Sequence, residues 1–155
     1  MTGWRIGYTA SCPEIAKVMS NLQSHATSNP NSIAQAATVA ALNGDGKEIA
    51  MMKAEFEKRR NYMFELIISI DGFSCRKPQG AFYVMMNISK LKGKTLGGKV
   101  IETSDDLANV LLDQAKLALV PGSGFGADDF MRWSYATSME NIKEGLNRLE
   151  KFLSE

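Results

Sequence analysis

Near the start of the chain, the pattern of apolar and polar residues changes from that of a strand to that of helices. Over residues 4–10 apolar side chains alternate with polar or small ones, which predicts a strand. Pro13 suits the first turn of a helix, and a helix is expected over 13–23. A polar break at 24–31 separates it from a second, alanine-rich helix expected over 32–42. The chain is therefore predicted to open with one strand followed by two helices.

The longest periodic segment follows a glycine-containing break. Gly44-Asp-Gly46 ends the second helix, and the following segment, 47–70, is predicted to be a long amphipathic helix. Its apolar residues recur with a period of about 3.6, and most of its charged residues fall at other positions. The apolar residues are Ile49, Met52, Phe56, Met63, Leu66, Ile67 and Ile70.

Short strands and helices are expected in the second half of the chain. Strands are predicted over 73–76 and 81–88, around the Lys77-Pro-Gln-Gly turn, and the lysine-rich stretch 90–99 is predicted to be a surface loop. A helix N-capped by Ser104 is predicted to end near Lys116. It is followed by a buried strand over 117–120, a glycine-rich loop at 121–126 and a strand over 131–136. Ser138 is predicted to cap a terminal helix whose apolar stripe consists of Ile142, Leu146, Leu149 and Leu153.

Composition and charge narrow the classes of partner. A chain of 155 residues with 45% hydrophobic content can bury one sizeable core. Its 18 basic and 17 acidic residues form no long block of either sign, so neither a nucleic acid nor a membrane is expected as a partner. The sequence has no long apolar segment and no basic-then-apolar signal pattern at Met1, so a soluble, cytoplasmic protein is expected.

Metal-ligating and nucleophilic side chains are few. Cys12 and Cys75 lie far apart, and only His25 could join them, so no metal site is expected. The two cysteines are predicted to be free thiols. His25 stands alone in a polar segment, and we interpret it as a hydrogen-bonding residue of a loop or helix end rather than as a catalytic base.

Two arginines stand inside short apolar, β-prone strings, Arg5 in MTGWRIGY and Arg132 in MRWSYATS. A fixed charge in such a segment is costly unless it meets an anion. A guanidinium can donate two parallel hydrogen bonds to a phosphate or a carboxylate, and it stays charged at any working pH. The strings therefore predict two anion clamps. The alternative for each arginine is an ion pair within the protein or a charged head that reaches solvent.

Six strings are spread in order over most of the chain: MTGWRIGY at 1–8, QSHATSNPNSIAQ at 23–35, FEKRR at 56–60, KPQGAFY at 77–83, LVPGSGFG at 119–126 and RWSYATS at 132–138. Their order and spacing resemble the C-terminal half of class I, fold type I, pyridoxal-phosphate-dependent aminotransferases. Within that family the greatest likeness is to bacterial aspartate aminotransferases. The resemblance implies an α/β fold consisting of the end of the large domain and the small C-terminal domain.

The resemblance also implies a domain organisation and an activity. Residues 1–45 would be a remnant of the large cofactor-binding domain, and 46–155 would hold the bridging helix and the small domain. In the family, the lysine that forms the Schiff base with the cofactor lies just before the MTGWR string, so no catalytic residue is expected in this chain, which would be an inactive fragment. The parent is expected to move an amino group between an amino acid, aspartate or a similar one, and a 2-oxo acid such as 2-oxoglutarate.

Site residues and partners follow from the same resemblance. Arg5 matches the arginine that holds the phosphate of pyridoxal 5′-phosphate, and Arg132 matches the arginine that grips the substrate α-carboxylate. Ser28 and Asn29 match, more loosely, positions near the active site of the partner subunit in a homodimer. The loop at 121–126 is expected at the active-site edge, although its glycines alone indicate only turns, because the G-x-G-x-x-G spacing is absent.

Two further expectations and two alternative functions follow. The isolated chain is not expected to bind the cofactor specifically, and the apolar faces of its first two helices are expected to be exposed and to cause association or partial disorder. A non-catalytic α/β interaction domain on an aminotransferase-like scaffold remains an alternative, because a fold does not determine a function. Another fold type I pyridoxal-phosphate enzyme, such as a lyase or a decarboxylase, also remains open.

Overall fold

The computed structural model describes residues 1–154 and divides the chain into two units. The first unit is Met1–Ile49, and the second begins at Ala50. Position 155, which the expected second domain includes, lies outside the described residues. The division falls within the first turn of α3 (Lys47–Ser69), the long helix that the 3.6-residue period predicted.

The first unit holds a short 3-10 helix, η1 (Thr2–Trp4), and two α-helices, α1 (Pro13–Ala26) and α2 (Ser32–Leu42). The bounds of α2 are those predicted, whereas α1 continues three residues beyond the expected end at Gln23. The side chain of Asn31 caps α2, because its Oδ1 accepts hydrogen bonds from the backbone N–H groups of Ile33 and Ala34 at 2.9 and 3.1 Å.

The strand predicted over residues 4–10 is wrong. The chain leaves η1 through Arg5, which adopts a left-handed conformation with φ 51°, and residues 6–12 have no regular structure. Alternation of side chains makes a strand only where a neighbouring strand accepts and donates the backbone hydrogen bonds. No strand lies among the described residues of the first unit, so these bonds have no partner there.

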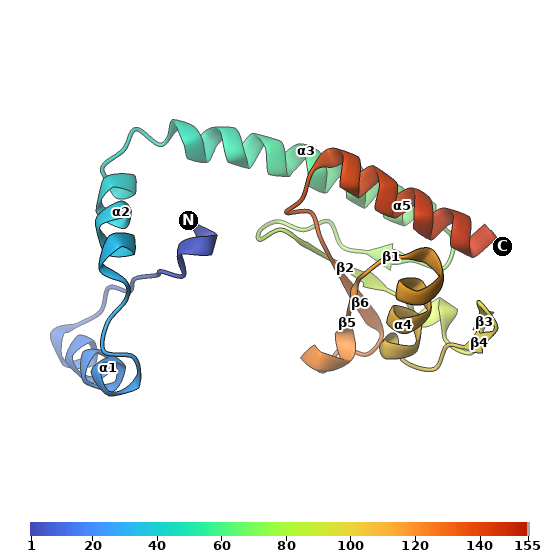
Figure 1. Ribbon diagram of the computed structural model, residues 1–155, viewed down its shortest axis with the longest axis horizontal. Coiled ribbons are helices and arrows are strands. Elements are labelled where there is room, and N and C mark those ends of the chain that lie inside the picture. Colours follow the sequence, from blue (N-terminus) through green and yellow to red (C-terminus); the bar gives the residue numbers. More distant parts are fainter. Residues whose placement is uncertain (155) are drawn as a thin grey trace. The chain divides into compact units, whose positions relative to one another are not determined.

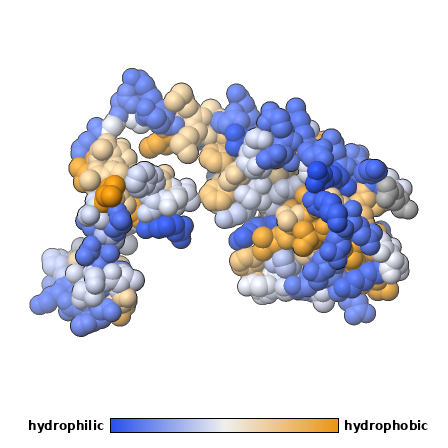
Figure 2. Space-filling model, in the orientation of Figure 1, coloured by the Kyte–Doolittle hydropathy of each residue, from blue (hydrophilic) through white to orange (hydrophobic). Residues whose placement is uncertain are grey.

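The apolar side chains of α1 and α2 lie at the surface of the first unit, as expected. Those of α1 recur at helical spacing and form one exposed stripe, which we call the α1 stripe: Ile15, Val18, Met19 and Leu22. On α2, Ile33, Val39 and Leu42 are also exposed, and Ala34 alone among the residues of this helix is buried. Figure 2 shows apolar surface over this part of the chain.

The second unit is built on an antiparallel sheet with the strand order β1-β2-β6-β5 (Figure 1). The two central strands are the longest and pair over five residues, from Tyr83↔Ser134 to Asn87↔Phe130. The strands are β1 (Ser74–Cys75), β2 (Tyr83–Asn87), β5 (Val120–Pro121) and β6 (Phe130–Ser134). They confirm the expected strands near 73–76, 81–88 and 131–136: β1 and β2 are shorter than predicted, and β6 begins one residue earlier and ends two residues earlier.

One face of this sheet is buried against the helices of the second unit. In β2 and β6 every second residue is buried, as the two-residue period of a half-buried strand requires. Helix α4 (Ser104–Ala115) packs against α5 (Met139–Ser154), and α3 contributes Met63 and Ile67 to the same core. The other buried apolar residues of this cluster include Val84, Met86, Leu107, Leu111, Met131, Trp133, Ile142, Leu146 and Leu149.

Three local predictions for the second unit need correction. Thr103, not Ser104, is the N-cap of α4, because Thr103 and Asp106 form a reciprocal capping box. The expected loop over 90–99 contains η2 (Ser89–Leu91) and most of a β3–β4 hairpin, and its Leu91 packs in the core. The buried strand expected over 117–120 is the short edge strand β5, in which Val120 is 39% exposed.

The hairpin could have been predicted from its turn. Strands β3 (Thr95–Leu96) and β4 (Lys99–Val100) are joined by Gly97 and Gly98, which both have positive φ. Two such residues between paired strands are typical of a type I′ turn, for which Gly-Gly is a favoured sequence.

Within the described part of the chain, no helix combines the length and the apolar character needed to span a bilayer.

Candidate functional site

Arg132 lies on the face of the sheet that the core does not use. Its neighbours in β6, Met131 and Trp133, are both buried, and successive side chains of a strand point to opposite faces. The Arg132 side chain is therefore directed away from the core, and the residue as a whole is partly exposed. The alternation of apolar and polar residues that predicted β6 also determines this orientation.

The guanidinium of Arg132 stands between two aromatic rings. Its Cζ lies 4.5 Å from the centre of the Tyr83 ring and 4.6 Å from the centre of the Phe125 ring. Tyr83 belongs to β2, where Met85 pairs with Arg132, so Tyr83 lies diagonally across on the same face. Phe125 comes from η3 (Gly122–Phe125), the 3-10 turn that follows β5. We call this arrangement the arginine sandwich.

The sandwich leaves the hydrogen-bonding edge of Arg132 free. Aromatic rings bind the flat faces of a guanidinium, and all five of its N–H donors lie in the plane between those faces. Among residues 1–154, no carboxylate or carbonyl makes an ion pair or hydrogen bond with Arg132. An ion pair within the protein, the alternative for this residue, is therefore not observed in the described chain. The arrangement presents a fixed, partly desolvated fork that can bind a carboxylate.

Aromatic contacts link four of the six strings to this sandwich. Phe56 of the FEKRR string stacks on Phe82 of the KPQGAFY string, with ring centres 6.2 Å apart. Phe56 also meets the ring edge of Tyr135, from the RWSYATS string, at 6.1 Å. Phe82 contacts Tyr83, and Phe125 of the LVPGSGFG string completes the sandwich. Segments far apart in the sequence are thus joined by aromatic contacts that lead to Arg132.

The glycine-rich loop is tightly seated below the sandwich. A Cβ added to Gly122 would come within 2.0 Å of the Ala127 carbonyl oxygen and 2.4 Å of that of Phe130. Gly126, which closes the turn, has φ 68°, a conformation that suits glycine. Two of the three glycines are therefore required by backbone geometry. The loop presents the aromatic ring of Phe125, and nothing in it resembles a phosphate cradle.

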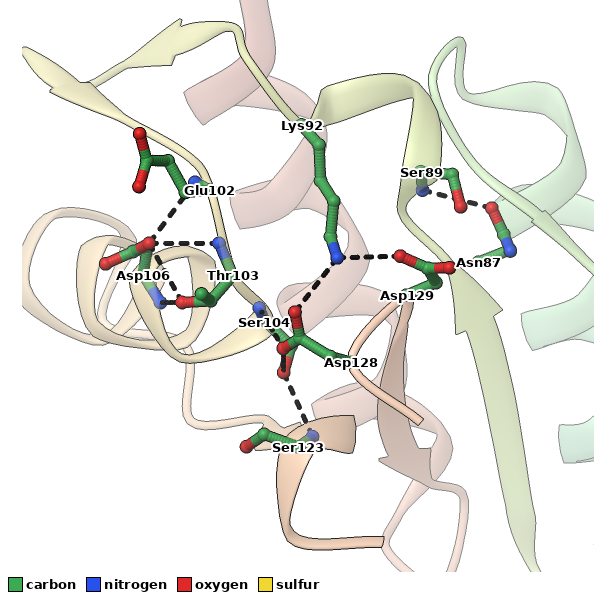
Figure 3. A network of polar contacts seen from close by, with 10 residues as sticks. All are labelled: Asn87, Ser89, Lys92, Glu102, Thr103, Ser104, Asp106, Ser123, Asp128 and Asp129. Atoms are coloured by element: carbon green, nitrogen blue, oxygen red, sulfur yellow. Dashed lines mark hydrogen bonds and ion pairs between the residues drawn. The ribbon is translucent and has the colours of Figure 1, made fainter. Parts of the chain in front are cut away.

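Asp128 connects this loop to the N-terminus of α4 (Figure 3). Its Oδ1 accepts hydrogen bonds from both the backbone N–H and the hydroxyl of Ser104, each at 2.8 Å. The Ser104 Oγ in turn accepts a hydrogen bond of 3.1 Å from the backbone N–H of Ser123 in η3. On the other side, Lys92 Nζ lies 2.9 Å from Asp128 Oδ2 and 2.6 Å from Asp129 Oδ1. We call these contacts the Asp128 clasp.

The contacts of the Asp128 clasp change the pKa values of Asp128 and Lys92. The Lys92 ammonium, followed by the backbone N–H and hydroxyl of Ser104, lowers the pKa of Asp128 from 3.8 to about 2. Hydrogen bonds to Asp129 and then to Asp128 raise the pKa of Lys92 above its ordinary value. Both charged forms are therefore favoured by the folded structure. The ion pair is partly open to solvent, so salt weakens it.

Arg5 belongs to the first unit and has no partner in the described chain. It is exposed, and no hydrogen bond or ion pair from any of residues 1–154 reaches its guanidinium. Its left-handed backbone, at φ 51°, is uncommon for a residue other than glycine, asparagine or aspartate. Ser28 also has a positive φ, 64°, and with Asn29 it forms the exposed turn between α1 and α2. Arg5 and Arg132 lie in different units, and each is a free guanidinium within its own unit.

Sequence reasoning missed the residues that support Arg132. Tyr83 could have been found, because it lies two positions from Met85 on a predicted half-buried strand, so the two side chains point to the same face. Phe125 carried a weaker signal, an aromatic residue inside a glycine-rich loop. The clasp carried none, because Lys92 and Ser104 reach Asp128 across 36 and 24 positions of sequence.

The remaining candidates have no role in this arrangement. Cys12 and Cys75 are free thiols, and burial raises the pKa of Cys75. His25 lies exposed in the last turn of α1. Among the described residues, no group of three or more histidine, cysteine, aspartate or glutamate side chains is arranged to hold a metal ion.

The family model of aminotransferase class I and II matches residues 1–149. An aspartate aminotransferase of Geobacillus stearothermophilus is 46% identical over 153 residues, which is 99% of this chain and 38% of that protein. A probable aspartate/prephenate aminotransferase of Rickettsia bellii is 47% identical over 152 residues, 97% of this chain and 38% of that protein. This chain thus spans about 38% of the length of these curated relatives.

A solved structure also matches. The crystal structure of the aspartate aminotransferase from Rhizobium meliloti superposes with a TM-score of 0.91 at 44% identity, over 99% of this chain and 39% of that one. The expected α/β fold of the C-terminal part of a fold type I transferase is confirmed by this match.

Proposed function

Because this chain belongs to the aminotransferase class I and II family, we propose that it is the C-terminal part of a pyridoxal-phosphate-dependent aminotransferase. The parent protein moves an amino group between an amino acid, aspartate or a similar one, and a 2-oxo acid such as 2-oxoglutarate. The names of the two curated relatives, aspartate and aspartate/prephenate aminotransferase, support this substrate class. The location proposed for the parent is the cytoplasm, in keeping with the two free thiols.

The arginine sandwich is the observation on which the proposal depends. An amino acid and a 2-oxo acid differ at the α-carbon but share the α-carboxylate beside it. One rigid, permanently charged fork that binds this group therefore accepts both substrates in turn. Arg132 has this form, because two rings hold its faces and its donors carry no partner from the described chain.

Pyridoxal 5′-phosphate fits the second free arginine. Arg5 is exposed and unpaired among the described residues, and its guanidinium suits a phosphate. When bound, the cofactor supplies an aldehyde that takes up the amino group and a ring that accepts electrons from the substrate α-carbon. Arg5 would hold the phosphate, and Arg132 would bind and orient the substrate carboxylate. The lysine that binds the aldehyde is proposed to lie elsewhere in the parent.

Substitution of Arg132 in the full-length parent tests this proposal. Arg132→Ala should raise KM for both the amino acid and the 2-oxo acid, because both lose the same charge-assisted contact. A hydrogen-bonded contact to a charged group contributes roughly 1.5–3 kcal/mol, which corresponds to about a 10- to 150-fold lower kcat/KM. Arg132→Lys keeps the charge but loses the planar fork, so its effect should be intermediate. Steady-state kinetics with each substrate varied in turn provides the measurement.

A matched control separates the effect of losing Arg132 from the effect of losing any arginine charge. Arg148, on α5, already pairs with Glu144 and with the Lys116 carbonyl. Arg148→Ala should leave both KM values close to those of the wild type. If Arg132→Ala also leaves them unchanged, Arg132 does not bind substrate and the proposed function loses its main support.

The role of Arg5 has a separate test. Arg5→Ala in the full-length parent should weaken binding of pyridoxal 5′-phosphate, because one charged partner of the phosphate is lost. Equilibrium dialysis or fluorescence titration of the cofactor measures this effect, and Lys17→Ala, a change at another exposed cation of the first unit, is the control. Equal cofactor affinity in the two variants would contradict the assignment of Arg5.

The parent is also proposed to be a homodimer, with Ser28 and Asn29 near the partner's active site. The support is the resemblance of the QSHATSNPNSIAQ string to the family, together with the exposed, left-handed turn at Ser28. Sedimentation of the full-length protein would determine its oligomeric state. A monomer that transfers amino groups at the full rate would contradict this part of the proposal.

A further inference from the structure

We propose that Ser104 is a positioning residue for the carboxylate site: its buried hydroxyl fixes the η3 turn, and η3 holds Phe125 against Arg132. The inference rests on the proposed role of Arg132 in carboxylate binding. Ser104 lies at the start of α4 and touches neither Arg132 nor Phe125 in the contacts described above. It acts through the backbone of the turn.

The hydroxyl of Ser104 is fully buried and makes two hydrogen bonds. The residue has 0% exposure, and its Oγ donates to Asp128 Oδ1 at 2.8 Å and accepts from Ser123 N at 3.1 Å. Thr103 already supplies the cap of α4, so the Ser104 side chain is not needed to begin the helix. Its two hydrogen bonds instead join α4 to the glycine-rich loop itself, at Ser123, and to Asp128, which follows that loop.

The η3 turn needs this hydrogen bond because few other contacts hold Phe125 in place. Phe125 is 55% exposed and is not part of the apolar core. The turn is closed by bonds within itself, from Gly126 N to Ser123 O and from Ala127 N to Gly122 O, both 3.0 Å. Ser104 Oγ supplies the hydrogen bond from outside the loop to the backbone of Ser123, two positions before Phe125. Loss of that bond releases the turn toward solvent and carries the ring with it.

The two rings of the sandwich therefore differ in rigidity. Tyr83 is held by a central strand of the sheet, whereas Phe125 depends on the turn. A guanidinium with only one ring beside it regains rotamers, and the substrate must then supply the entropy cost of ordering it. The contact to the carboxylate exists in both the bound substrate and the transition state. Misplacement of Phe125 should therefore raise KM for both substrates and leave kcat nearly unchanged.

The first experiment compares Ser104→Ala with Thr103→Ala in the full-length enzyme. Both changes remove a hydroxyl at adjacent positions of the same helix start, and both lower stability. Ser104→Ala should raise KM for the amino acid and the 2-oxo acid by roughly fivefold, the equivalent of about one buried neutral hydrogen bond, with kcat within about twofold. Thr103→Ala should lower the melting temperature without this change in KM.

A double-mutant cycle with Phe125→Leu tests the route of the effect. Leucine removes the ring that stacks on Arg132 but leaves the turn in place. If Ser104 acts through Phe125, Ser104→Ala should raise KM no further in the Phe125→Leu background. Independent effects would multiply instead. Should Ser104→Ala fail to fold, Ser104→Cys replaces the hydroxyl by a thiol, which is a weaker acceptor for the Ser123 N–H, and enters the same cycle.

The outcomes separate this inference from the proposed function. If Arg132→Ala leaves KM unchanged, the proposed function fails, and with it the premise of the positioning role. If Arg132→Ala raises KM while Ser104→Ala behaves like Thr103→Ala, the function stands and the positioning role is overturned. Multiplying effects of Ser104→Ala and Phe125→Leu would overturn the positioning role as well.

Discussion

At the scale of single residues, Arg132 is held rigid without a counterion from any of residues 1–154. Stacking between Tyr83 and Phe125 holds the flat faces of Arg132, so the charge is ordered while its donors stay free. An acidic partner would have ordered the side chain equally well but would have occupied the fork. Residues 1–154 instead form an ion-pair cluster elsewhere, between Lys92 and the two aspartates of the clasp.

The clasp predicts how stability depends on pH. The folded structure lowers the pKa of Asp128 to about 2 from 3.8, so its contribution is complete above about pH 5 and is lost as the pH falls toward 2. The difference in unfolding free energy between the wild type and Asp128→Asn should therefore shrink from about pH 5 to about pH 2. Urea unfolding at intervals across this range measures it.

Asp129→Asn is the control for this titration. It removes a contact to the same lysine, whereas Asp128 also accepts two hydrogen bonds from Ser104. The comparison therefore measures how much of the Asp128 effect comes from the Ser104 hydrogen bonds rather than from the contact with Lys92. A difference between wild type and Asp128→Asn that stays constant down to about pH 2 would show that the clasp does not favour the charged carboxylate.

At the scale of elements, helices were predicted more accurately than strands. The bounds of α2 and the long α3 followed from local periodicity and from the Gly44-Asp-Gly46 break, which act within a few residues. The segment 4–10 has the alternation of a strand but no neighbour within its unit. The α1 stripe shows the reverse: a helix forms with its apolar side exposed, because its backbone hydrogen bonds are internal.

The α1 stripe predicts association of the isolated chain. Val18 is 68% and Leu22 71% exposed, and apolar side chains gathered on one face favour contact with another copy. Replacing both Val18 and Leu22 with glutamate should reduce self-association in analytical ultracentrifugation. Asn21→Glu adds a charge to the same helix outside the stripe and should reduce it less.

The same pair of substitutions should act differently in the full-length parent. If the rest of that protein covers the stripe, the double variant should be destabilised by roughly 1.5–3 kcal/mol for each buried side chain. A parent that tolerates both changes would show that the stripe faces solvent there too.

At the scale of the whole molecule, the chain carries two proposed binding groups, and the reactive lysine is proposed to lie elsewhere in the parent. Arg5 and Arg132 are the groups proposed to bind the two anions, the cofactor phosphate and the substrate carboxylate. The family resemblance implies that the lysine that binds the cofactor stands just before the MTGWR string, which occupies the first residues of this sequence. Transfer of the amino group needs such an amine, which holds the aldehyde and moves the proton.

The isolated chain is therefore predicted to be inactive. Mixed with pyridoxal 5′-phosphate, an amino acid and a 2-oxo acid, it should form no new 2-oxo acid beyond a protein-free control. Absorption titration should show only unsaturated, non-stoichiometric binding, as expected for adducts of surface lysines. Amino-group transfer, or a band that saturates at one equivalent of cofactor, would contradict the assignment of the reactive lysine to another part of the parent.

The sequence by itself determined the five α-helices, the strands β1, β2 and β6 and the two candidate arginines, because periodicity and charge in an apolar context are local properties. Ser138 as a cap and Arg132 on a half-buried strand needed no long-range information. Tertiary structure alone decided that Ser104 would serve Asp128 instead of capping α4, and that Phe125 would meet Arg132. These contacts depend on which segments the packed core brings together, and no pattern along the chain encodes a distance through space.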